Sequence, residues 1–235
     1  MTVAGEMIYI ATSPKDIGHV WRNSETISLD PISKDMYTMS GLTAKQREIM
    51  FDSHPDARYN AGNPKPLTPT QMIIELHIQQ LRTGPNLDAL LENKIIPGMF
   101  RDLDISSNNH QAVTGRTGTS VVVSLKELVI DAFIKAETEA YFGPRILKIA
   151  PRIAHTFISW EDVNWKMLFN LPPFLSQDML SVKQALVDAF TTYYRLPRSE
   201  RPDGTFFVTS FEDLHREIGF DEEVIGKMFM LHYWA

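Results

Sequence analysis

Apolar residues recur at helical spacing through most of the chain after Pro69, and prolines and glycines divide them into separate segments. The clearest run, at residues 125–136, ends before Gly143-Pro144. Ser124 and Glu127 precede it with the spacing of a capping box, in which each side chain bonds the other residue's backbone N–H. Such segments each bury one face against a core. The sequence therefore predicts a mainly α fold.

Helix breakers also set the limits of the other expected helices. Gly84-Pro85, Pro172-Pro173 and Leu196-Pro197 end successive segments, because Pro cannot continue the helical hydrogen-bond ladder. These further helices are predicted at residues 71–82, 87–96, 152–169, 178–194, 209–218 and 221–235.

The N-terminal residues predict a small β hairpin followed by a helix. Residues 2–10 are rich in β-favouring side chains, with Gly5 in the turn, and Ser13-Pro14 has the chemistry of a helix start. The buried face of that helix is expected to carry Ile17, Val20 and Trp21.

Two stretches predict loops rather than helices. Five prolines mark residues 31–70 as a long loop, with a short helix at residues 43–51. Residues 106–120 are polar and rich in Gly and Asn, which predicts an exposed connection.

The last segment, from Asp221 onward, predicts an apolar helix that has a start signal and no stop signal. Asp221 can cap its first turn, and apolar side chains then recur up to Tyr233 and Trp234 without a closing Gly, Asn or Pro. We expect these two aromatic side chains to be exposed apolar surface that awaits a partner, and the chain to be part of a larger fold.

Composition restricts the classes of partner and chemistry. The chain has 43% hydrophobic and 22% charged residues, typical of a globular domain, and its formal charge of −6 disfavours nucleic acid. No apolar stretch approaches the roughly 20 residues of a membrane anchor. With no cysteine, the chain cannot supply a disulfide, a thiolate metal ligand, a cysteine nucleophile or a thiolate to haem.

Polar motifs give little indication of chemistry. None of the seven histidines forms an HExxH pair. Asp52, His54 and Asp56 could ligate a metal, but polar turn chemistry is the commoner explanation for such a trio beside Pro55. Residues 115–120 lack the Gly-Lys-Ser/Thr ending of a phosphate loop. Glu137 and Glu139 predict a solvated helix face.

Aromatic residues crowd two regions, before Pro172 and at the end of the chain. They predict either core packing or the wall of an apolar ligand pocket, and the sequence leaves both readings open. The pocket reading names Trp160, Phe169, Phe174, Phe229 and Tyr233.

Several residue strings resemble the cytochrome P-450 family over nearly the whole chain. They are SPKDI at residues 13–17, LKELVIDAF at 125–133, AYFGP at 140–144, WKMLF at 165–169 and MFMLHYW at 228–234. Together with SERP at 199–202, they resemble most the fungal enzymes related to the sterol-hydroxylase and prostacyclin-synthase branch.

The resemblance implies the N-terminal half of a haem-thiolate monooxygenase. Residues 1–235 would form one partial domain truncated in the central long helix, with a hairpin and first helix at 1–30, a long loop at 31–70 and a helical region at 71–235. The complete enzyme would hydroxylate an apolar small-molecule substrate, using O2 and electrons from a reductase, and family members are often bound to the endoplasmic-reticulum membrane. The compartment of this chain is not indicated.

The resemblance also implies what this chain lacks. The family's haem-ligating Cys and Glu-x-x-Arg pair have no counterpart in the sequence, so we expect no catalytic residue, no metal ligand, no stably bound haem and no activity alone. By position, His77 would donate to a haem propionate, unless it only belongs to an amphipathic helix.

Two alternatives remain open at the level of sequence. One is a non-catalytic helical module that binds an apolar ligand or a partner helix through its C-terminal aromatics. The other is haem ligated by His77 or His232.

Overall fold

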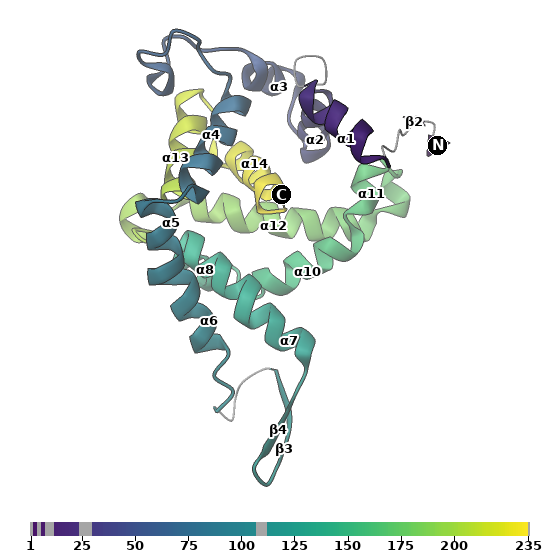
Figure 1. Cartoon of the computed structure of the whole chain (residues 1–235), viewed down its shortest axis with the longest axis vertical. Coiled ribbons are helices and arrows are strands. Elements are labelled where there is room, and N and C mark those ends of the chain that lie inside the picture. The colour runs from purple at the N-terminus through teal and green to yellow at the C-terminus, as the bar shows by residue number, and fades with distance from the viewer. Residues whose placement is uncertain (1, 4–5, 8–11, 24–29, 107–111, 235) are drawn as a thin grey trace.

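The computed structural model describes residues 2–3, 6–7, 12–23, 30–106 and 112–234, and it is mainly helical (Figure 1). Two small antiparallel sheets accompany the helices, one pairing β1 (Thr2–Val3) with β2 (Glu6–Met7) and the other pairing β3 (Val113–Thr117) with β4 (Ser120–Val123). The mainly α prediction and the N-terminal hairpin are confirmed. Gly5 and residues 8–10 of the predicted hairpin lie outside the described residues.

The helices follow one another with short connections. The first part of the chain contains α1 (Pro14–Arg22), α2 (Asp30–Ser40), α3 (Ala44–Phe51), the 3-10 helix η1 (Arg58–Asn60), α4 (Pro69–Leu81), α5 (Pro85–Leu90), the π-helix η2 (Leu91–Ile95) and α6 (Ile96–Asp102). The second part contains α7 (Leu125–Val129), the π-helix η3 (Ile130–Lys135), α8 (Ala136–Phe142), α9 (Arg145–Ile149), α10 (Ile153–Val163), α11 (Trp165–Leu168), the 3-10 helix η4 (Pro173–Leu175), α12 (Gln177–Arg195), the 3-10 helix η5 (Arg198–Glu200), α13 (Phe206–Glu217) and α14 (Glu222–Trp234).

Local sequence signals explain most of these helix ends. Helices α3 and α4 begin with full capping boxes, in which Thr43 pairs with Gln46 and Thr68 pairs with Gln71. Only half of the predicted box at α7 forms: the Ser124 hydroxyl accepts from the Glu127 N–H, whereas the Glu127 carboxylate contacts His155 Nε2 at 2.7 Å. The Glu127 side chain therefore ties α7 to α10 instead of closing the helix start.

Helix α14 lies in the core of the molecule and packs along α12 (Figure 1, yellow against green). Phe229 is only 3% exposed, the Tyr233 hydroxyl is 2.6 Å from that of Thr138, and Trp234 packs edge-on against Trp160. The expectation of an exposed aromatic end is therefore wrong. The helix is apolar nearly all round because neighbouring helices cover it on several sides.

The two predicted loops contain regular structure. Helix α2 occupies part of the 31–70 stretch, where Pro31 falls in the first turn and costs no helical hydrogen bond, and its Tyr37 is buried. The β3–β4 hairpin begins in the second half of the 106–120 stretch, and its residues are exposed or half-buried, as expected of a connection at the surface.

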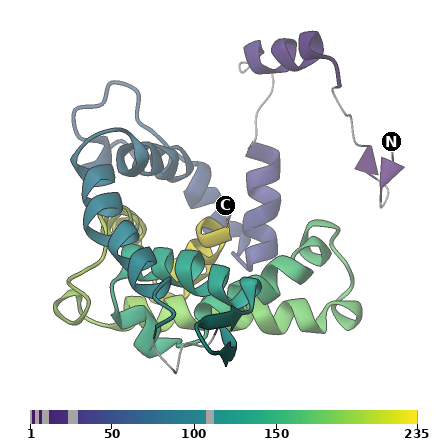
Figure 2. The ribbon, with the colours of Figure 1, turned by 60° about the horizontal axis from the view of Figure 1, so that its bottom comes forward.

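Helix α1 forms as predicted, but its apolar face is not buried. Ile17, Val20 and Trp21 are all exposed, and Trp21 is 81% exposed. Figure 2 shows α1 standing clear of the helical body. The amphipathic pattern correctly predicts the helix, but it does not show whether another element covers its apolar face.

None of the helices in the described part of the chain combines the length and the apolar character that crossing a bilayer requires.

Candidate functional site

A cavity of about 480 Å³ lies among α4, η3, α8, α10, α13 and α14. Its walls are mostly aromatic and aliphatic, with a few polar groups, which is the usual character of a small-molecule site. The lining residues are His77, Leu81, Ile134, Glu137, Thr138, Tyr141, Phe142, Phe157, Phe207, Phe229, His232 and Tyr233.

Helical spacing brings these side chains to one place. On η3 and α8 the lining positions begin at Ile134 and recur three, four, seven and eight residues later, which places them on one helix face. On α14, Phe229 is followed by lining residues three and four positions later. Two helix faces thus meet across the cavity, and Phe157 of α10 packs edge-on against Tyr233 with ring centres 4.9 Å apart.

Two histidines face each other at one side of the cavity. His77 Nε2 of α4 lies 3.4 Å from His232 Nδ1 of α14, and the His77 ring lies against Phe207 with centres 4.1 Å apart. Burial lowers the pKa of His77, and burial together with the nearby His77 and His215 lowers the pKa of His232 to about 3. Both imidazoles are therefore neutral at physiological pH.

One hydroxyl pair joins α8 to α14 at the cavity wall. The hydroxyls of Thr138 and Tyr233 lie 2.6 Å apart, and Thr138 also donates to the carbonyl of Ile134 at 2.6 Å. Burial raises the pKa of the Tyr233 phenol, so this group stays protonated and acts as a hydrogen-bonding group of a rigid wall.

The structure separates the residues that the pocket reading had grouped. Phe229 and Tyr233 line the cavity, together with His77. Trp160 is fully buried in the core behind Trp234, and Phe169 and Phe174 are exposed on the surface, so these three do not line the cavity.

Other lining residues were missed because their partners are distant in the sequence. Phe157 was considered only as one of a crowd, and Glu137 as part of a solvated face. The spacing of residues 134, 138 and 141 was the available signal for a shared face, but it does not tell which helix that face meets.

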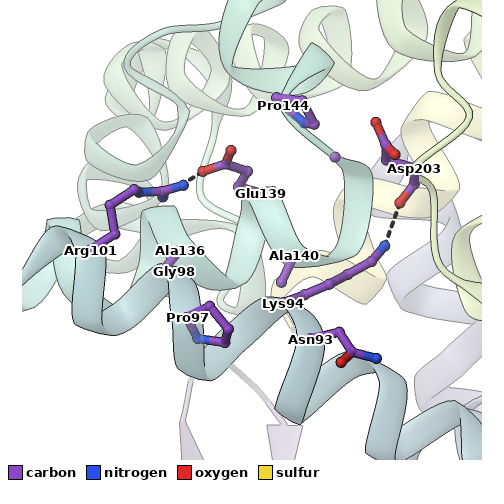
Figure 3. A pocket seen from close by; sticks show the side chains of 11 residues that line it. Asn93, Lys94, Pro97, Gly98, Arg101, Ala136, Glu139, Ala140, Pro144 and Asp203 are labelled. Carbon is purple, nitrogen blue, oxygen red and sulfur yellow. Dashed lines mark hydrogen bonds and ion pairs between the residues drawn. The ribbon is translucent and has the colours of Figure 1, made fainter.

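A second hollow contains charged residues that are already paired within the protein (Figure 3). It lies where η2 and α6 approach α8, and Figure 3 shows Arg101 reaching Glu139 while Lys94 reaches Asp203. Arg101 bonds the Glu139 carboxylate at 2.6 Å, and Lys94 donates to the backbone carbonyl of Asp203. Because its cations are already paired within the protein, we consider the aromatic cavity the better candidate site.

The residues do not fit the haem that the family resemblance implies. The sequence contains no cysteine to provide a thiolate, and the lowered pKa of His77 disfavours the positive charge that would suit a propionate. His77 is instead paired with His232. Among the described residues, no group of three or more potential ligands is placed to hold a metal ion, and His54 of the Asp52–Asp56 turn contacts the carbonyl of Ile49.

Comparison of the chain with protein-family models, with curated proteins and with solved structures gives no match.

Proposed function

We propose that this chain binds an apolar small molecule in the aromatic cavity. The observation that carries the proposal is the convergence of six elements on one 480 Å³ space with mostly apolar walls. A ligand that covers this aromatic and aliphatic surface removes it from water, which contributes about 25 cal/mol of favourable free energy per Å² of apolar surface buried.

Leu81 offers a direct test because it is 51% exposed and lines the cavity, so a larger side chain can enter the space without disturbing the core. We expect the wild-type chain to bind the neutral probe 1-naphthalenemethanol in isothermal titration calorimetry. Leu81→Trp should weaken that binding by about tenfold or more, because the indole would occupy part of the volume.

Ile78 provides the matched control. It lies on the same helix, is 47% exposed and does not line the cavity, so Ile78→Trp should leave the affinity unchanged. Absence of binding by the folded wild-type chain, or equal affinities of the two variants, would contradict the proposal.

The residue strings quoted above support a second proposal, that the chain belongs to a haem-thiolate monooxygenase of the cytochrome P-450 type. The bound molecule would then be the apolar substrate that such an enzyme hydroxylates with electrons from a reductase. Because these 235 residues include no cysteine, we expect the chain alone to show no thiolate-ligated haem in a reduced carbon-monoxide spectrum. A thiolate-type band from the purified chain would refute that expectation.

Docking of a partner helix on the C-terminal aromatics is not favoured. Phe229 is buried, and Tyr233 and Trp234 are half-buried and already packed against Phe157 and Trp160.

A further inference from the structure

Glu137 gives the aromatic cavity a negative charge. Among the twelve lining residues it is the only one that is ionised at neutral pH, since the others are apolar, hydroxyl-bearing or histidine. The two histidines do not compensate it, because their lowered pKa values keep them neutral.

The Glu137 carboxylate has no hydrogen bond or ion pair with another residue of the described chain. Glu139, two positions later on the same helix, shows the contrast because it bonds Arg101 at 2.6 Å. The walls around Glu137 desolvate its carboxyl group and raise its pKa, although the side chain remains exposed at the mouth of the cavity. An acid in such a place is more stable with a counter-charge nearby.

Aromatic rings line the same cavity as this carboxylate. Tyr141 is one helical turn further along α8. Burial, with a smaller contribution from the charge of Glu137, raises the pKa of both Tyr141 and Tyr233. Tyr233 and Phe157 stand edge to face at the same wall. The negative faces of such rings attract a cation electrostatically, most strongly where water is excluded.

We propose that the cavity selects an organic amine, with the protonated amino group at Glu137 and the apolar body among the aromatic rings. This inference rests on the proposed function, since it specifies the class of ligand that the same cavity takes. A neutral ligand would leave the Glu137 charge uncompensated, and an anionic ligand would be repelled by it. A protonated amine provides both the counter-charge and N–H donors for the carboxylate.

The test compares 1-naphthylmethylamine with 1-naphthalenemethanol at pH 7.5, by isothermal titration calorimetry on the full chain. The two probes differ in carrying an ammonium or a hydroxyl on the same apolar body. We expect the wild-type chain to bind the amine about tenfold more tightly, the preference typical of one hydrogen bond to a charged group. Glu137→Gln should remove this preference, because amine binding should weaken about tenfold more than alcohol binding.

Glu75→Gln is the control for net charge. Glu75 lies on α4 two residues from His77, is exposed and does not line the cavity, so its substitution removes the same charge without changing the site. The preference for the amine should persist in this variant.

Each other outcome has a separate meaning. Equal binding of amine and alcohol by the wild type would overturn the inference while leaving the proposed function intact. A preference that survives in Glu137→Gln, or disappears in Glu75→Gln, would show that the general charge of the chain is responsible and would also overturn it. Binding of neither probe would refute the proposed function and the inference together.

Discussion

Gly226 of α14 packs directly against α12, and replacing it with Ala tests the packing that holds the cavity walls. A Cβ atom at this position would overlap Thr191 Oγ1 and would lie 2.9 Å from the Thr191 backbone N and 3.0 Å from the Val187 carbonyl oxygen of α12. Turning the Thr191 side chain relieves only the first contact. The two backbone contacts require the helices to move apart.

The expected magnitude is a balance of two opposing effects. Overpacking of a tight core costs about 1–3 kcal/mol, and the backbone contacts place this site near the upper end. Replacing Gly by Ala inside a helix stabilises the folded state by about 1 kcal/mol, because Ala has the higher helix propensity. We therefore expect Gly226→Ala to lower the free energy of unfolding by about 2 kcal/mol, which for a chain of this size lowers Tm by about 4–8 °C.

Urea denaturation followed by far-UV circular dichroism measures this change, with Gly98→Ala as the control. Gly98 is also helical, but its added Cβ would meet Ala136 Cβ at 3.4 Å, an ordinary contact, so the substitution should be neutral or stabilising. If Gly226→Ala were as stable as the wild type, α12 and α14 would not be in the close contact described, and the position of the α14 cavity wall would be wrong.

Three further predictions concern buried polar groups. Glu212→Gln should destabilise by about 3 kcal/mol in urea denaturation, because it leaves the 2%-exposed guanidinium of Arg201 without its counter-charge. Burial lowers the pKa of His232 to about 3 and that of His215 to about 4, whereas the unfolded chain protonates both near pH 6.5. The free energy of unfolding should therefore fall as pH drops below 6.5, by about 2 kcal/mol per histidine at pH 5. In a His232→Phe variant, the difference between the free energies of unfolding at pH 7 and pH 5 should be about half of that in the wild type. An unchanged difference would contradict the buried neutral imidazole. Tyr233→Phe should cost about 1 kcal/mol by thermal denaturation, because the 2.6 Å hydroxyl contact with α8 disappears, and no loss of stability would argue against that contact.

The helices could be predicted because their signals are local. Gly84-Pro85 and Gly143-Pro144 end helical segments independently of tertiary contacts. A proline has no backbone N–H, so it interrupts the hydrogen bonds of the helix in which it lies. Helix α2 was missed for a related reason, because Pro31 signals a break at most positions and is harmless in a first turn.

Burial was harder to predict than helix formation. The amphipathic pattern of α1 predicts a buried face, yet Trp21 is exposed. The aromatic end of α14 predicts that Tyr233 and Trp234 are exposed, yet both are half-buried and pack against Phe157 and Trp160. A helical pattern shows which side chains share a face. It does not show how many neighbours that face has.

The candidate site illustrates the same division. Sequence alone pointed to His77, Phe229 and Tyr233, but it could not separate them from Trp160, which lies in the core, or recognise that Glu137 stands at the mouth of a cavity. Local chemistry determined that this chain forms helices, where most of them begin and end, and that it offers no cysteine. Only the tertiary structure decided that α4, η3, α8, α10, α13 and α14 line a cavity. The contacts that form it join residues as far apart as His77 and His232, whose meeting depends on the packing of the helices between them.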